Sequence, residues 1–185
     1  NILAAQRFVG AASTRPTTLL APLRSLIVND FRRPHRAERG RFCCMTEKIY
    51  SYPVRIYWED TDAGGIVYHA NYLRYMERAR TEFLRTLGLE QRKMQLEGSP
   101  VIVVSNMDIR FVRPAVLDDA LTVQTRIKLL RRASVVFEQT IVRGEETICT
   151  AQIRCASVDM KTGMPTPTDE RILAALEPYA PENSI

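Results

Sequence analysis

The chain has 185 residues, 45% of them hydrophobic and 25% charged, with a formal net charge of +5. This length suits one domain with a sizeable core, and no apolar run reaches the roughly 18–20 residues of a membrane span. The charge is uneven, because residues 1–44 hold eight arginines against two acids, a balance of +6 that leaves −1 for residues 45–185. A nearly neutral main part gives no electrostatic case for nucleic-acid binding.

Residues 1–44 differ in composition from the rest of the chain. They are rich in Arg, Ala, Ser and Thr, with prolines at 16, 22 and 34 and without the continuous apolar core of a secretory signal. Strand-like alternation begins directly after Met45. We therefore predict a disordered Arg-rich extension over 1–44, arising from a misassigned start, and a domain over 45–185. An organelle-targeting segment is the alternative interpretation of the extension.

The four cysteines, Cys43, Cys44, Cys149 and Cys155, predict neither a disulfide framework nor a metal site. Cys149 and Cys155 are six residues apart in one strand-like run, roughly 20 Å when extended, so they cannot bond each other. No Cys/His metal spacing is present. This usage is typical of a reduced, cytoplasmic protein with small apolar cysteine side chains.

The hydrophobic periodicity predicts one strand followed by one long helix. Residues 50–58 alternate, with Val54, Ile56 and Trp58 on one face. Residues 69–87 have helical spacing and end at Gly88, a good stop signal. The apolar stripe of this helix consists of Leu73, Met76, Ala79, Phe83 and Leu87.

The rest of the chain is predicted to be mostly strands. After a short helix at 90–97, alternating or β-branched runs cover 101–112, 121–129, 135–141 and 148–158, with turns at 131–132 and 143–145 and a closing helix at 169–176. This order predicts an α+β fold with one helix against a five-stranded antiparallel sheet. Since one helix covers one face only, we expect a partner subunit to bury the other face or the sheet edge.

The most informative segment lies between the first strand and the long helix. Asp62 precedes Gly64-Gly65, and His69 follows at the predicted start of the helix. A carboxylate can act as base or nucleophile, the glycines let a ligand approach the backbone, and the helix N-terminus offers N–H donors to an oxyanion. Thioester hydrolysis needs little more, because the thiolate is already a good leaving group.

Residues 57–72 read YWEDTDAGGIVYHANY and are continued by ERAR at 77–80. This string resembles the hotdog-fold thioesterases, within them the 4-hydroxybenzoyl-CoA thioesterase group, and most closely its Tol-Pal-associated (YbgC-type) acyl-CoA branch. The resemblance covers about residues 50–176. It implies a long helix wrapped by the sheet, a coenzyme A thioester substrate, no cofactor, a cytoplasmic location, and a homodimer or homotetramer with active sites at subunit interfaces. Tol-Pal or lipid-synthesis proteins are partners implied by the resemblance alone.

The family pattern assigns the catalytic carboxylate to Asp62 and the oxyanion-polarising N–H to His69. We expect Gly64, Gly65, Tyr68, Asn71 and Tyr72 to contact substrate. Tyr68 and Tyr72 are comparably well explained as core aromatics.

Other interpretations stay open at this point. Asp60, Thr61 and Asp62 could serve only to cap a turn. Glu77 on the helix is an alternative catalytic carboxylate, although a salt bridge to a neighbouring arginine explains it better. Three arginines could meet coenzyme A phosphates or be solvated: Arg113, Arg131 and Arg132.

The sequence therefore predicts an acyl-CoA thioesterase acting on short- to medium-chain or aromatic acyl groups. The alternatives are a non-catalytic acyl-thioester-binding or envelope-associated scaffold module and an acyl-thioester hydratase. The hydratase is disfavoured, because the seven-residue spacing from Asp62 to His69 differs from the pattern expected for hydration.

Overall fold

The computed structural model describes residues 48–182 and residue 184. The predicted boundary between an extension and a domain lies outside these residues and stays a prediction. In chain order the elements are β1 Tyr50–Arg55, the 3-10 turn Trp58–Asp60, α1 His69–Thr86, α2 Gln91–Leu96, β2 Val101–Phe111, β3 Ala120–Arg131, β4 Ser134–Arg143, β5 Glu146–Val158, α3 Glu170–Leu176 and a final 3-10 turn, Glu177–Tyr179.

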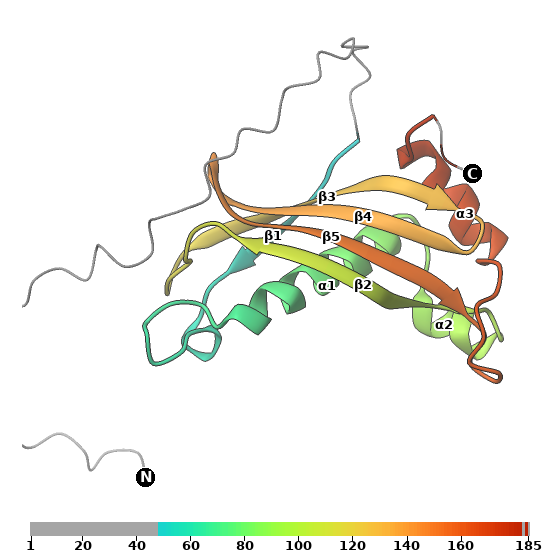
Figure 1. Cartoon of the computed structure of the whole chain (residues 1–185), viewed down its shortest axis with the longest axis horizontal. Helices are drawn as coiled ribbons and strands as arrows, with labels where there is room; N and C mark the ends of the chain where they lie inside the picture. Colours follow the sequence, from blue (N-terminus) through green and yellow to red (C-terminus); the bar gives the residue numbers. More distant parts are fainter. Residues whose placement is uncertain (1–47, 183, 185) are drawn as a thin grey trace, which may run out of the picture. The chain divides into compact units, whose positions relative to one another are not determined.

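The five strands form one antiparallel sheet in the order β1-β3-β4-β5-β2, which confirms the predicted fold class. β3, β4 and β5 are joined by tight turns, as the sequence predicted. The chain passes through α1 and α2 between β1 and β2, and this long connection carries β2 to the opposite edge of the sheet from β1 (Figure 1).

α1 packs along one face of the sheet and forms the core with it (Figure 1). Met76, Ala79 and Phe83 of the predicted stripe are buried, and the Phe83 ring stacks on Tyr50 of β1 at 5.2 Å between centroids. Each large apolar side chain buried in this way contributes about 1.5–3 kcal/mol relative to exposure. The 18-residue helix is therefore held by the sheet rather than by its own propensity.

The outer face of the sheet is mostly polar, so of the two expected surfaces for a partner subunit the sheet edge fits better than the second face. Val135, Phe137 and Ile141 of β4 all lie on the inner face of the sheet and are buried. Most of the alternating outward positions carry polar side chains, such as Arg126 and Glu138, which form an ion pair of 2.7 Å, although Val136 and Val142 also lie there. Exposed apolar side chains occur instead on the edge strand β2, at Val103, Val104 and Phe111.

The first strand ends earlier than predicted, at Arg55 rather than Trp58. Ile56 still faces the core, but its backbone N–H now donates to the Asp119 carbonyl outside the ladder of β1. The chain then turns through Trp58–Asp60, and this turn directs Trp58 outward, where 78% of it is exposed. The prediction that the strand continues to Trp58, with this side chain on the same face as Val54 and Ile56, was wrong.

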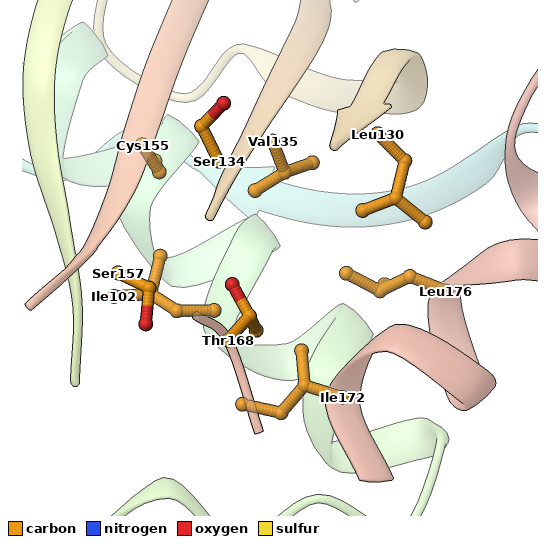
Figure 2. A pocket seen from close by; sticks show the side chains of 9 residues that line it. All are labelled: Ile102, Leu130, Ser134, Val135, Cys155, Ser157, Thr168, Ile172 and Leu176. Atoms are coloured by element: carbon orange, nitrogen blue, oxygen red, sulfur yellow. The ribbon is translucent and has the colours of Figure 1, made fainter. Parts of the chain in front are cut away.

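The C-terminal segment packs against one end of the sheet. α3 begins at the capping residue Asp169 and packs Ile172 and Leu176 against the ends of β3, β4 and β5. Figure 2 shows these side chains lining a narrow crevice together with Ser157 and Thr168. The crevice has no space for a water molecule, so it belongs to the core rather than to a ligand site.

The two cysteines of the described part, Cys149 and Cys155, are buried and unbonded, as the sequence predicted. Burial raises the pKa of the Cys149 thiol to about 12. Both thiols therefore act as apolar core groups. No helix among residues 48–182 has the length and hydropathy to cross a membrane.

Candidate active site

The loop between β1 and α1 is organised around Asp60. The Asp60 carbonyl oxygen accepts hydrogen bonds from the Tyr68 N–H and from the Asn71 side-chain amide, both at 2.9 Å. Its carboxylate accepts the Tyr57 N–H at 2.8 Å. These three bonds join the beginning of the loop to its end and to the first turn of α1.

Asp62 lies in the turn at the tip of this loop. Its Oδ1 accepts the Gly64 N–H at 2.8 Å, its N–H donates to the Ile66 carbonyl, and its carbonyl accepts the Gly65 N–H. Gly65 has a positive φ of 74°, a conformation that favours glycine. The carboxylate is exposed, and among residues 48–182 nothing bonds its Oδ2. Asp62 therefore caps a turn and still presents a free carboxylate oxygen.

α1 begins immediately after the loop, at His69, with Tyr68 as its capping residue. Tyr68 has no side-chain capping bond, and the first turn of α1 contains no acidic residue. In the described part of the chain, the N–H groups of His69 and Ala70 meet no acceptor. Two donors at the positive end of an 18-residue helix thus stay free for an anionic oxygen.

His69 and Tyr68 are both exposed, and their rings contact each other with centroids 4.3 Å apart. The imidazole makes no hydrogen bond with residues 48–182. The position of His69 therefore fits the predicted role for its backbone better than a role for its ring.

Asn71 and Tyr72, predicted to contact substrate, are buried and bonded to the protein. Asn71 is 5% exposed and holds the Asp60 carbonyl, and Tyr72 accepts the Ala115 N–H on its hydroxyl oxygen at 3.0 Å. Ala115 in turn accepts the Val67 N–H at 2.9 Å. This chain of contacts fastens the loop to the segment between β2 and β3.

Glu77, the alternative carboxylate, is exposed on α1 two turns after His69. Its Oε1 accepts the Thr81 hydroxyl at 2.8 Å, and it forms no ion pair with an arginine of the described residues. The predicted salt bridge of Glu77 is therefore wrong. Neither the loop nor a free helix N-terminus adjoins this carboxylate, so it lacks the surroundings that Asp62 has.

Arg113, one of the three arginines considered for phosphate binding, is paired with Glu146 at 2.9 Å. Glu146 also binds Arg143 at 2.5 Å, which reaches Asp119 at 2.6 Å. The group joins the turn between β4 and β5 to the segment after β2. Arg131 and Arg132 are exposed at the β3–β4 turn, at the end of β3 away from the segment that fastens the loop.

The anchors of the loop were the part that sequence analysis missed. The sequence indicates Asp60 only as a possible turn cap, whereas its main-chain carbonyl holds the loop together, and no pattern indicates Ala115 as the acceptor of the Val67 N–H. No side-chain pattern identifies a backbone acceptor, but an Asp next to a turn is the usual sign of a locally bonded segment.

The comparisons with known proteins agree with this geometry. Residues 56–176 match the Thioesterase-like superfamily, a span from the end of β1 through α3. The chain belongs to this superfamily. It is 40% identical over 131 residues to "Acyl-CoA thioesterase YbgC" of Haemophilus influenzae, covering 71% of this chain and 96% of that protein.

Further similarities extend over the same region. "Acyl-CoA thioester hydrolase YbgC" of Escherichia coli is 41% identical over 131 residues, which cover 70% of this chain and 97% of that one. A probable thioesterase of Bartonella henselae, known from its crystal structure, superposes with a TM-score of 0.63 at 38% identity, covering 66% of this chain and all of the other. The expected hotdog fold is thereby confirmed.

Proposed function

We propose that the chain is an acyl-CoA thioesterase in which Asp62 activates the attack and the start of α1 stabilises the oxyanion. The observation that carries the proposal is the combination of a free Asp62 oxygen with unbonded N–H groups at His69 and Ala70 on one loop–helix junction. The superfamily and the names of the relatives support the same reaction.

The chemistry follows from the two groups. Asp62 either removes a proton from the attacking water or attacks the thioester carbonyl itself, giving a mixed anhydride that water then opens. In both routes negative charge develops on the carbonyl oxygen, which the free N–H groups of α1 can receive. A preorganised donor of this kind lowers the barrier by about 3–4 kcal/mol. Collapse of this tetrahedral species breaks the C–S bond and expels the coenzyme A thiolate, which takes up a proton. The general-base route gives the free acid directly, whereas the nucleophilic route gives the mixed anhydride, which water hydrolyses to the free acid and the Asp62 carboxylate.

We propose a short- to medium-chain or aromatic acyl-CoA as substrate and no cofactor. The resemblance of residues 57–80 to the 4-hydroxybenzoyl-CoA thioesterase group supports this substrate class. A cytoplasmic location is proposed on the same resemblance. Association with Tol-Pal or lipid-synthesis proteins rests on the resemblance alone.

We also propose that two copies pair through their β2 edges. β2 is an edge strand with exposed valines at 103 and 104, and its ladder with β5 is irregular between Val104 and Asn106. Between residues 101 and 111 it has neither the lysine nor the proline that often protects a free edge. A twofold pairing would cover these groups and bring a second chain toward the exposed Asp62 loop. A homotetramer remains the alternative.

The test is release of free thiol from a panel of acyl-CoAs by the full chain and by two variants. Asp62→Asn should abolish turnover while the protein stays folded, and Glu77→Gln should leave it close to wild type. Loss of activity in Glu77→Gln but not in Asp62→Asn would transfer the catalytic role to the helix. Saturable binding without turnover in the wild type would favour the binding module, and water addition to an enoyl-CoA would favour the hydratase.

A further inference from the structure

The proposed reaction needs the Asp62 carboxylate and the N–H groups at the start of α1 at a fixed separation. The two groups belong to different segments, so contacts between these segments must maintain it. Asp62 is in an exposed turn, whereas the N–H groups of His69 and Ala70 belong to a helix held by the core. Within the turn, the bonds of Asp62 to Gly64, Gly65 and Ile66 are local. They shape the turn but do not attach it to the helix.

Asn71 provides a direct side-chain attachment between the two segments. Its Nδ2 donates to the Asp60 carbonyl at 2.9 Å, two residues before Asp62 and eleven residues away in sequence. Among residues 48–182, no other α1 side chain donates a hydrogen bond to the backbone of residues 57–68. The same Asp60 oxygen accepts the Tyr68 N–H, so a single acceptor binds both the capping residue and the first turn of the helix.

The surroundings of Asn71 argue for positioning rather than for substrate contact. The residue is 5% exposed, and its amide already has its acceptor inside the protein. Burial, and then the neighbouring Asp60 carboxylate, raise the pKa of the buried Tyr75 phenol, so a second α1 side chain faces the same loop residue. Tyr75 meets the side chain of Asp60, whereas Asn71 holds its main-chain carbonyl. Asn71 is thus the α1 side chain that bonds the backbone of the loop.

We infer that Asn71 is a positioning residue, which holds Asp60 so that the Asp62 carboxylate and the free N–H groups of α1 keep their catalytic separation. The inference rests on the proposed function. A displacement of about 1 Å between reacting groups can cost on the order of 100-fold in rate. Loss of the Asn71 bond should therefore lower kcat about 10- to 100-fold, with KM changed less than about twofold, because Asn71 itself does not touch the substrate.

The experiment uses the full chain with Asn71→Leu, which keeps the branched shape of the side chain but cannot donate, and Asn71→Ala as a smaller second variant. Thr81→Val is the matched control, because it removes one side-chain hydrogen bond from the same helix three turns farther on. Kinetics with the preferred acyl-CoA and melting temperatures are measured for each. We expect lower kcat at a nearly unchanged KM in both Asn71 variants and wild-type kinetics in Thr81→Val.

A second readout separates positioning from stability. In an Asp62→Asn background without turnover, infrared spectra of a carbonyl-labelled acyl-CoA report how strongly the helix N–H groups polarise the bound carbonyl. Adding Asn71→Leu should move the C=O band back toward its position in free acyl-CoA. An unmoved band, or kcat that falls only in proportion to the unfolded fraction, would overturn the inference.

The outcomes also separate this inference from the proposed function. Turnover by the wild type together with unchanged kcat in Asn71→Leu overturns the role of Asn71 alone. No turnover by the wild type with any acyl-CoA overturns the proposed function, and the positioning role with it.

Discussion

At the scale of single residues, the two adjacent glycines of the loop have different physical roles. A Cβ added to Gly64 would lie 3.0 Å from Asp62 Oδ1, the atom that the Gly64 N–H holds. A Cβ on Gly65 would meet nothing within 4 Å, but its φ of 74° disfavours any other residue. One glycine is therefore needed for the position of a carboxylate and the other for the backbone of the turn.

This difference predicts that two small substitutions affect different quantities, one the activity and the other the stability. Gly64→Ala should displace the Asp62 carboxylate and lower kcat by about tenfold, with a stability change below about 1 kcal/mol. Gly65→Ala should reduce the free energy of unfolding by about 1–2 kcal/mol, because alanine resists the left-handed conformation. Thiol release and urea unfolding measure the two quantities. Equal effects of the two variants on kcat would show that the carboxylate contact is unimportant.

The interactions of the Asp169 carboxylate, which caps α3, should make the stability of the protein depend on pH. Its carboxylate binds the Arg171 guanidinium, the Ser99 hydroxyl at 2.8 Å and the Arg171 N–H at 2.9 Å. Arg171 is the main cause that holds the pKa of Asp169 well below its usual range. A lowered folded pKa stabilises the protein above the unfolded value of about 3.9, and the contribution is lost as pH falls below it.

Asp169→Asn should therefore lower the free energy of unfolding by about 1 kcal/mol at pH 7, because asparagine keeps a capping oxygen but loses the charge. The effect stays this small because Arg171 is partly exposed to solvent. The difference between wild type and variant should begin to shrink as pH falls from about 5 to about 3, and it should vanish only below the lowered folded pKa of Asp169. Urea unfolding at several pH values measures it. A difference that stays constant over this range would mean that the charge of Asp169 does not contribute.

At the scale of elements, a buried polar chain joins α1 to the sheet. Arg80 is 7% exposed and donates to Gln139 Oε1 of β4 at 2.7 Å. Gln139 Nε2 donates to Thr125 of β3 at 2.9 Å and to the Met76 carbonyl of α1 at 3.0 Å. Burial lowers the pKa of the Arg80 guanidinium, for which Gln139 is a neutral acceptor. An ion in this setting is costly once its acceptor is removed.

A double-mutant cycle tests this chain. Gln139→Leu should destabilise the protein by about 3 kcal/mol, because it leaves the Arg80 cation buried without its acceptor. Arg80→Met should cost less, since it removes the charge and leaves one unsatisfied amide oxygen. The double variant should be more stable than the sum of the two predicts by at least about 1 kcal/mol. Additive losses in urea unfolding would show that the two side chains act independently.

The same elements show what the sequence could and could not predict. Apolar periodicity located α1 to within one residue and placed all five strands, because each must bury one face. The burial of Arg80 depends on its bond to Gln139 of β4, and the exposure of Trp58 depends on the turn at Trp58–Asp60. Apolar periodicity could predict neither. The loop string indicated Asp62, whereas the bonds of Asp60 and Ala115 are non-local backbone contacts without a sequence signal.

At the scale of the whole molecule, the edge strand β2 is one of the places with exposed apolar side chains, together with the loop before α1, α2 and the segment after β5. The outer face of the sheet is mostly polar, and α1 and its core neighbours cover the inner face. β2 is left with one side unpaired, and Val104 on it is 48% exposed. A free apolar edge favours association with another strand, and a twofold axis lets the edge pair with itself.

The proposed pairing predicts different effects for two lysine substitutions. Val104→Lys lies on the free edge and should be tolerated by one protomer, but it would place two like charges near each other across a β2–β2 interface. Gln152→Lys lies on the exposed outer face of β5, between Asp108 and Glu138 in the neighbouring strands, and should leave the assembly intact. Light scattering after size exclusion should give one 21.1 kDa chain for Val104→Lys and at least twice that mass for Gln152→Lys.

Measurements of activity test whether the proposed dimer completes the active site. If a second copy completes the surroundings of the exposed Asp62 loop, thiol release by Val104→Lys should fall in step with the fraction of dimer and recover as protein concentration rises. Gln152→Lys should keep wild-type activity at every concentration. A monomeric Val104→Lys with full activity would place the complete site within one chain, and a dimeric Val104→Lys would move the interface to another surface.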